Sequence, residues 1–116
     1  MAVSKNFEFA PEEQIVANFG LAFAHPARVV IMRRLLQEGT LPFTALVEGT
    51  PLSKPTMSQH ITLLKRLDML IPTTMPNNLA GYQLNYEVYR AGANATREQF
   101  RTATTVPLQR CKAERG

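Results

Sequence analysis

Apolar residues in the first half of the chain recur at the three- and four-residue spacing of amphipathic helices. From Pro11 onward, Ile15, Phe19 and Ala22 follow this spacing, and two glutamates occupy the first turn, where the helix dipole favours acidic side chains. The next proline, Pro26, interrupts the run. The pattern therefore predicts a first helix that begins at Pro11 and ends before Pro26.

A second helix is predicted to begin at this proline. His25 precedes it as a cap-region residue, proline is favoured at the first helical position, and Gly39 is suited to ending the helix. The apolar stripe of this helix is predicted to comprise Val29, Met32 and Leu36, widened by Ile31 and Leu35.

A third and a fourth helix are predicted on either side of a turn at residues 49–51, which reads Gly-Thr-Pro. The third helix is short and covers residues 42–48. Its apolar side chains Phe43, Leu46 and Val47 are predicted to face inward.

The fourth helix has a polar leading end within the stretch LSKPTMSQHITLLKRLDML. Ser53 is a natural N-cap, and Pro55 falls in the first turn, where its missing N–H costs no intrahelical hydrogen bond. The apolar stripe starts only at Met57 and continues through Ile61 and Leu64. The side chains that point away from this stripe are Lys54, Thr56, Ser58, Gln59 and Thr62.

Two short extended runs follow, MLIPTTM and GYQLNY, joined by the turn-rich segment PNNLAG. They predict a β-hairpin. Asn85 can then cap a fifth helix that extends to about Thr102, with Val88, Ala91 and Phe100 among its apolar positions.

A short helix, a turn, and a helix that is polar at its start and apolar afterwards constitute a helix-turn-helix. The apolar stripe anchors the second helix on the domain, and the polar leading end is left to meet base edges. Glutamine pairs bidentately with adenine, serine and threonine bind bases or phosphates, and lysine reaches guanine or phosphate. With the hairpin as a wing, the predicted fold is mainly α with a small β-hairpin, a winged helix-turn-helix of about five helices and a two-stranded wing.

The charge distribution suits a polyanionic partner. The formal net charge is +4, and residues 25–66 carry six basic side chains against two glutamates, whereas residues 1–24 carry one lysine against three glutamates. This basic segment contains the predicted helix-turn-helix and favours nucleic acid by the counterion-release argument. A solvated helix surface would account equally for so mild an excess. Lys65 of this segment is included among the predicted DNA contacts.

Two stretches carry a family resemblance: HPARVVIMRRLL at residues 25–36 and LVEGTPLSKPTMSQHITLLKRLDML at residues 46–70. From Phe19 to about Asn85 the chain resembles the ArsR family of small winged-helix bacterial repressors. The resemblance implies a homodimer, held by its first and last helices, that binds double-stranded DNA at a pseudo-palindromic operator in adjacent major grooves. The family's recognition-helix positions fall on Ser53, Thr56, Ser58, Gln59 and His60.

Three departures from the family pattern modify these implications. Where many members carry a Cys-x-Cys metal site this chain has LPFT at residues 41–44, and its last helix contains no histidine, so we predict neither a metal site of the usual kinds nor a cofactor. Asp68 replaces the usual glycine after the recognition helix and tolerates the left-handed conformation. Residues 69–86 contain no charged side chain, so any wing contact with DNA is predicted to use backbone amides, Thr73, Thr74, Asn77 and Asn78.

Two residues have competing interpretations. Arg28 either clamps a DNA phosphate or ties the second helix to a neighbouring carboxylate. His60 either contacts DNA or makes the structural hydrogen bond that is more common for a histidine at the edge of a buried stripe. A metal site that paired His60 with His25 would have too few ligands.

Composition narrows the classes of protein. A chain of 116 residues with 45% apolar and 19% charged side chains suits one folded domain. We assign the winged-helix DNA-binding and dimerisation domain to residues 1–104 and a flexible basic tail to residues 105–116. The single cysteine, Cys111, excludes an intrachain disulfide and favours a reducing cytoplasm, and no run is apolar enough to suggest a membrane span.

Four phenylalanines, Phe7, Phe9, Phe19 and Phe23, lie in the first two dozen residues. For so small a chain they favour a subunit interface over an ordinary core. The sequence contains no paired carboxylates, nucleophile set, glycine-rich phosphate loop or ligand cluster that would indicate an enzyme. The alternative to a dimeric repressor is a winged-helix protein-interaction module with reduced DNA binding, which would use the uncharged wing.

Overall fold

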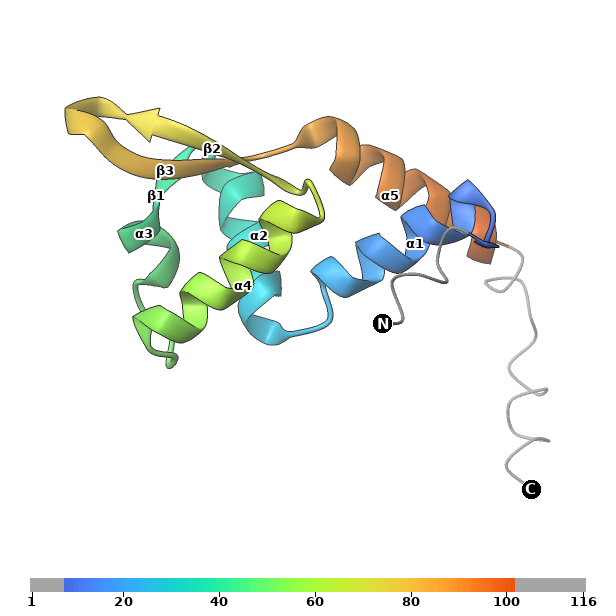
Figure 1. Cartoon of the computed structure of the whole chain (residues 1–116), viewed down its shortest axis with the longest axis horizontal. Coiled ribbons are helices and arrows are strands. Elements are labelled where there is room, and N and C mark those ends of the chain that lie inside the picture. The colour runs from blue at the N-terminus through green and yellow to red at the C-terminus, as the bar shows by residue number, and fades with distance from the viewer. Residues whose placement is uncertain (1–7, 102–116) are drawn as a thin grey trace, which may run out of the picture.

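The computed structural model describes residues 8–101, which form five α-helices and a three-stranded antiparallel sheet (Figure 1). The elements in chain order are α1 (Pro11–Ala22), α2 (Pro26–Glu38), β1 (Leu41–Pro42), α3 (Phe43–Val47), α4 (Lys54–Arg66), β2 (Leu70–Met75), the 3₁₀ turn η2 (Pro76–Asn78), β3 (Leu79–Leu84) and α5 (Tyr86–Phe100). The predicted fold, mainly helical with a small hairpin, is confirmed. The predicted tail at residues 105–116 lies outside the described residues.

One hydrophobic core lies between α2, α3, α4 and the base of the hairpin. Its fully buried large side chains are Ile31, Met32, Leu35, Leu46, Met57, Ile61, Leu64 and Met69. Three of them come from α2 and three from α4, so these two helices present their apolar faces to each other. Complete burial of a side chain of this size is worth about 1.5–3 kcal/mol, which makes this contact the main anchor of α4.

The buried face of α2 differs from the predicted stripe. Leu36, predicted to be buried, is 39% exposed and Val29 is half-buried, whereas Arg28 is only 8% exposed. Arg28 precedes Ile31 and Leu35 by three and seven positions and therefore shares their face of the helix. The predicted burial of Ile31, Met32 and Leu35 is confirmed. The burial of Arg28 was not predicted, because an arginine is not counted in an apolar stripe unless its hydrogen-bond partners are known.

The sheet has the strand order β1-β3-β2. Strand β2 pairs with β3 from Leu70 opposite Leu84 to Met75 opposite Leu79, and β1 adds Leu41 opposite Tyr82. Leu79 and Ala80, predicted to belong to the turn, are the start of β3, and the turn is confined to Pro76–Asn78. The strand β1 was not predicted, and Pro42 belongs to it and not to the third helix, because its pairing depends on residues forty positions away.

Helices α1 and α5 lie side by side, run in opposite directions, and form the end of the molecule away from the wing (Figure 1). Asn85 caps α5 as predicted, since its Oδ1 accepts a hydrogen bond from the backbone N–H of Val88 at 3.3 Å. The close approach of the helices requires Gly92, because a Cβ there would overlap the ring of Phe19. Of the apolar positions noted for this helix, Val88 is half-buried, and Ala91 and Phe100 are exposed.

Candidate nucleic-acid interface

The leading end of α4 is held by a local cap. The Ser53 hydroxyl donates to Thr56 Oγ1 at 3.0 Å, and its oxygen accepts the backbone N–H of Thr56 at 3.4 Å. Pro55 lies in the first turn, and the first buried side chain is Met57. These features confirm the predicted start of the helix. The helix ends as predicted too, because Asp68 adopts a left-handed backbone conformation with φ of 59°.

Several predicted DNA contacts line the exposed side of α4. Lys54, Ser58 and Gln59 are exposed, and the side chains of these three residues have no hydrogen-bond partner in the described part of the chain. Thr62 is exposed as well, but its hydroxyl donates to the carbonyl oxygen of Ser58 at 2.9 Å. Thr56 is half-buried and serves the cap. The structure therefore leaves Lys54, Ser58 and Gln59 with their full hydrogen-bonding capacity.

Sequence reasoning missed Arg66 as a member of this surface. Ser58, Gln59, Thr62, Leu63 and Arg66 line a shallow hollow of about 250 Å³ on α4. Arg66 follows Gln59 by seven positions, which places both on the same side of a helix. That spacing was visible in the sequence and would have indicated Arg66 as a phosphate or base contact.

Arg28 and His60 are used inside the protein. Arg28 Nε donates to the carbonyl oxygen of Leu21 at 3.1 Å, and its NH1 group lies 2.9 Å from His60 Nδ1. These partners are a carbonyl oxygen and a histidine, and not the carboxylate that was predicted as one alternative for Arg28. For His60 the structural hydrogen bond is the interpretation that the geometry supports. Burial first, and then the neighbouring His25 and Arg28, lowers the pKa of His60 below its ordinary value of 6.5.

The basic segment offers DNA fewer exposed basic side chains than its sequence suggests. Arg34 NH1 donates to the carbonyl oxygens of Ala45 at 2.9 Å and Leu46 at 3.1 Å, which ties α2 to α3. Lys65 is exposed, and its ammonium lies 5.9 Å from the centre of the Tyr82 ring, at the limit of a cation–π contact. The basic side chains of residues 25–66 that remain exposed are Arg33, Lys54, Lys65 and Arg66.

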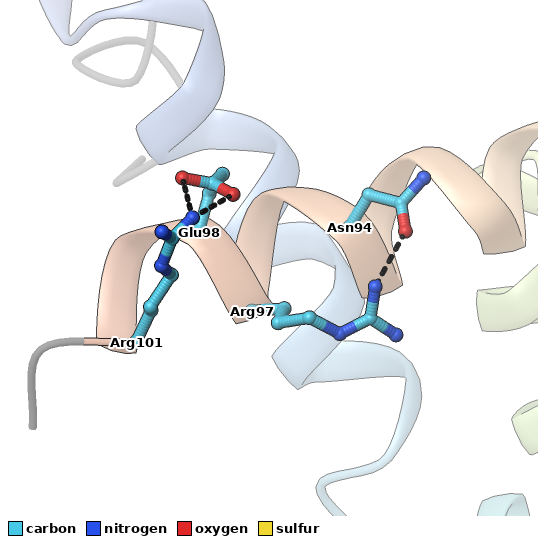
Figure 2. Close-up of polar contacts among 4 residues, drawn as sticks. All are labelled: Asn94, Arg97, Glu98 and Arg101. Carbon is cyan, nitrogen blue, oxygen red and sulfur yellow. Dashed lines mark hydrogen bonds and ion pairs between the residues drawn. The ribbon is translucent and has the colours of Figure 1, made fainter. Parts of the chain in front are cut away.

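Two further arginines lie at the end of α5, away from α4. Figure 2 shows Arg97 donating to Asn94 Oδ1 at 3.1 Å and Arg101 paired with Glu98 at 3.0 Å. The Arg101–Glu98 pair is well exposed, and such surface pairs contribute about 0–1 kcal/mol to stability. Asn94 and Glu98 both belong to α5. The side chains of Arg97 and Arg101 therefore make these contacts at the end of α5 and not with the exposed row of α4.

The tip of the wing is polar and uncharged. Asn77 and Asn78 are exposed and adopt left-handed conformations with φ of 67° and 60°, which asparagine tolerates better than most residues. Thr74 is exposed opposite Ala80, whereas Thr73 is half-buried. The wing tip and the leading end of α4 extend toward the same side of Figure 1, opposite the α1–α5 pair.

Other kinds of site find little support in residues 8–101. Within this range, no group of three or more His, Cys, Asp and Glu side chains is placed to hold a metal ion. Cys111 lies outside the described residues. No single helix of the described part is long and apolar enough to cross a membrane; α1 and α2 together meet that test by length and composition, but they are bent by 98° at their junction.

Comparisons with known proteins identify the fold. No protein-family model and no curated protein matches the sequence. Among solved structures, an ArsR family transcriptional regulator matches with a TM-score of 0.67 and 17% identity, covering 85% of this chain and 100% of that one. The transcriptional repressor BigR from Xylella fastidiosa matches with a TM-score of 0.60 and 18% identity over 90% and 98% of the two chains. NolR from Sinorhizobium fredii matches with a TM-score of 0.58 and 24% identity over 79% and 94%. The chain therefore has the winged helix-turn-helix fold of ArsR-family transcriptional regulators, as the resemblance of its sequence implied.

Proposed function

We propose that this protein is a sequence-specific DNA-binding transcriptional regulator, a dimeric repressor of the ArsR type that does not use the family's usual metal sites. The observation that carries the proposal is the leading end of α4. Lys54, Ser58 and Gln59 are exposed there without partners in the described residues, while Met57 and Ile61 anchor the helix in the core. A helix that reads a major groove needs both features. The similar solved structures support the proposal, since they are transcriptional regulators.

Selection of bound duplexes from a random pool tests this proposal directly. A symmetric dimer is expected to select two half-sites about one helical turn apart. Gln59→Ala is then expected to weaken binding to the selected operator by about 1–3 kcal/mol, the value of a bidentate base contact. Gln37→Ala is the matched control, because Gln37 is an exposed glutamine at the end of α2, outside α4 and outside the helices proposed for the dimer. Equally weak binding to all duplexes, together with unchanged affinity of Gln59→Ala, would contradict the proposal.

The dimer is proposed to form through α1 and α5. Large apolar side chains remain exposed on this pair and just before it: Phe9 (59%), Ile15 (38%), Leu21 (42%) and Phe100 (56%). Phe19 and Phe23, predicted to lie in the interface, pack within the chain with ring centroids 4.9 Å apart. Phe7 lies outside the described residues. A neighbouring subunit would cover the exposed apolar side chains.

Sedimentation of single variants tests the dimer. Ile15→Glu is expected to shift the protein toward monomer, because a carboxylate would have to be buried in an apolar interface. Leu36→Glu is the control, since Leu36 on α2 is equally exposed, 39% against 38%. A wild-type monomer, or equal effects of the two variants, would count against an interface on α1.

A protein-interaction module is the second candidate function. The observation that favours it is the uncharged wing, on which Ile71 and Leu79 are 38% and 53% exposed. A stoichiometric partner whose binding is abolished by Leu79→Asp but not by Lys54→Gln would support this function. Loss of operator binding in Lys54→Gln alone would support the first.

A further inference from the structure

The recognition helix α4 is joined to the α1–α2 corner by a buried arginine. Arg28 is 8% exposed, and it is the one charged residue buried in residues 8–101. Its side chain connects the last turn of α1, through the Leu21 carbonyl, with His60 on α4. His60 directly follows Gln59 in the sequence, so this contact acts on the turn of the helix that carries the proposed base-reading side chain.

A second histidine completes the cluster. His25 caps α2, since its Nδ1 accepts the backbone N–H of Ala27 at 3.0 Å, and its ring lies against the ring of His60 with centroids 4.3 Å apart. The cluster of His25, Arg28 and His60 therefore links three helices at one point. These two histidines are the only ones in the chain.

The contacts determine the protonation state of both rings. Arginine and a backbone N–H can only donate, so Nδ1 of His60 and Nδ1 of His25 must both be acceptors. Each ring is then neutral, with its proton on Nε2. A second proton on either ring would remove an acceptor and place a positive charge beside Arg28 or beside the other ring.

Two neighbouring groups disfavour the protonated form of His60, and both belong to the start of α2. They are His25 at the N-cap and Arg28 within the helix. Helix α1 contributes a carbonyl oxygen, and no carboxylate of the described residues contributes. Because the pKa of His60 is lowered in the folded protein, the cluster is intact above the ordinary value of 6.5. Its contribution falls as the pH drops below that value and is lost as the pH passes through the lowered pKa.

We propose that His25, Arg28 and His60 are positioning residues that hold the recognition helix, and that protonation of His60 releases it, so that operator binding weakens in acid. This proposal rests on the proposed function. The expected direction of the pH effect distinguishes this proposal from a simple effect of net charge. Protonation adds positive charge to the protein, and by electrostatics alone that would strengthen binding to DNA.

The test compares affinity for the selected operator between about pH 8 and about pH 5 at constant salt. The variant carries His25→Asn and His60→Asn, because asparagine Oδ1 accepts hydrogen bonds as Nδ1 does, is favoured at an N-cap and does not titrate. Wild-type affinity is expected to fall by about tenfold for each unit by which the pKa of His60 differs between the protein with α4 held and the protein with α4 released. The variant is expected to show a flat profile, and the change across the range is the readout, whatever its absolute affinity. A flat or rising wild-type profile, or an equal loss in the variant, would overturn the proposal.

A measurement without DNA separates this proposal from the proposed function. Nitrogen-15 spectra of the wild-type imidazoles are expected to show both rings as Nε2–H tautomers at neutral pH, with His60 titrating below 6.5. Titration at or above the ordinary value would overturn the positioning role. If the spectra agree but no duplex is selected at about pH 8, the proposed function fails, and the release of operator binding fails with it.

Discussion

The recognition helix and the wing both carry predicted DNA contacts, but they are built differently. Helix α4 has fully buried anchors in Met57 and Leu64 beside an exposed row of polar side chains. The wing is the hairpin of β2 and β3, and its tip is exposed and uncharged. The comparison shows that the polar row of α4 lies on a helix with fully buried side chains, whereas no residue at the tip of the wing is buried.

The largest expected difference concerns stability. Ile61→Ala is expected to lower the free energy of unfolding by about 2–5 kcal/mol, because it leaves a cavity beneath α4. Leu79→Ala in the wing is expected to change it by less than about 0.5 kcal/mol, since Leu79 is 53% exposed. Urea denaturation monitored by circular dichroism measures both. Comparable losses in the two variants would show that the wing is anchored as firmly as the helix.

A smaller difference is expected in the salt dependence of DNA binding. Lys54→Gln is expected to reduce the slope of log affinity against log salt by about one, the loss of one phosphate contact. Thr74→Lys introduces the charge that the wing lacks, and a gain of about one in the same slope would place the wing beside a phosphate. An unchanged slope in Thr74→Lys would indicate that the wing does not reach the DNA backbone.

The smallest effect is expected at the wing tip. Glycine at positions 77 and 78 keeps the left-handed turn while removing both amide side chains. Asn77→Gly combined with Asn78→Gly is expected to change operator affinity by less than about twofold, well below the effect of losing a bidentate base contact. A fluorescence anisotropy titration with the selected operator measures this change. A loss as large as that of Gln59→Ala would give the wing a direct part in base reading.

Much of the candidate site was predictable because its signals are local. Ser53 as a cap, Pro55 in the first turn and the late start of the stripe at Met57 depend on residues within one or two helical turns. The left-handed conformation of Asp68 was predictable for the same reason. Arg66 was not predicted as a contact, although its seven-residue spacing from Gln59 is an equally local signal.

Other features depend on pairs of residues far apart in the sequence. Arg28 and His60 are separated by thirty-two positions, and their internal hydrogen bond exists only because the fold brings the two residues together. Gly92 is required only because Phe19 packs on it. Neither contact produces a periodic pattern that a single sequence could reveal.

The sequence by itself determined the helices, their caps and the polar leading end of α4, because hydrogen bonding and side-chain periodicity within a helix act over a few residues. The tertiary structure alone decided which polar side chains remain exposed for a ligand and which are used internally. Arg28, Arg34 and His60 found partners on other segments, whereas Lys54, Ser58 and Gln59 found none in the described residues. The physical reason is that a buried polar group must be paired, and the partner becomes available only when distant segments meet.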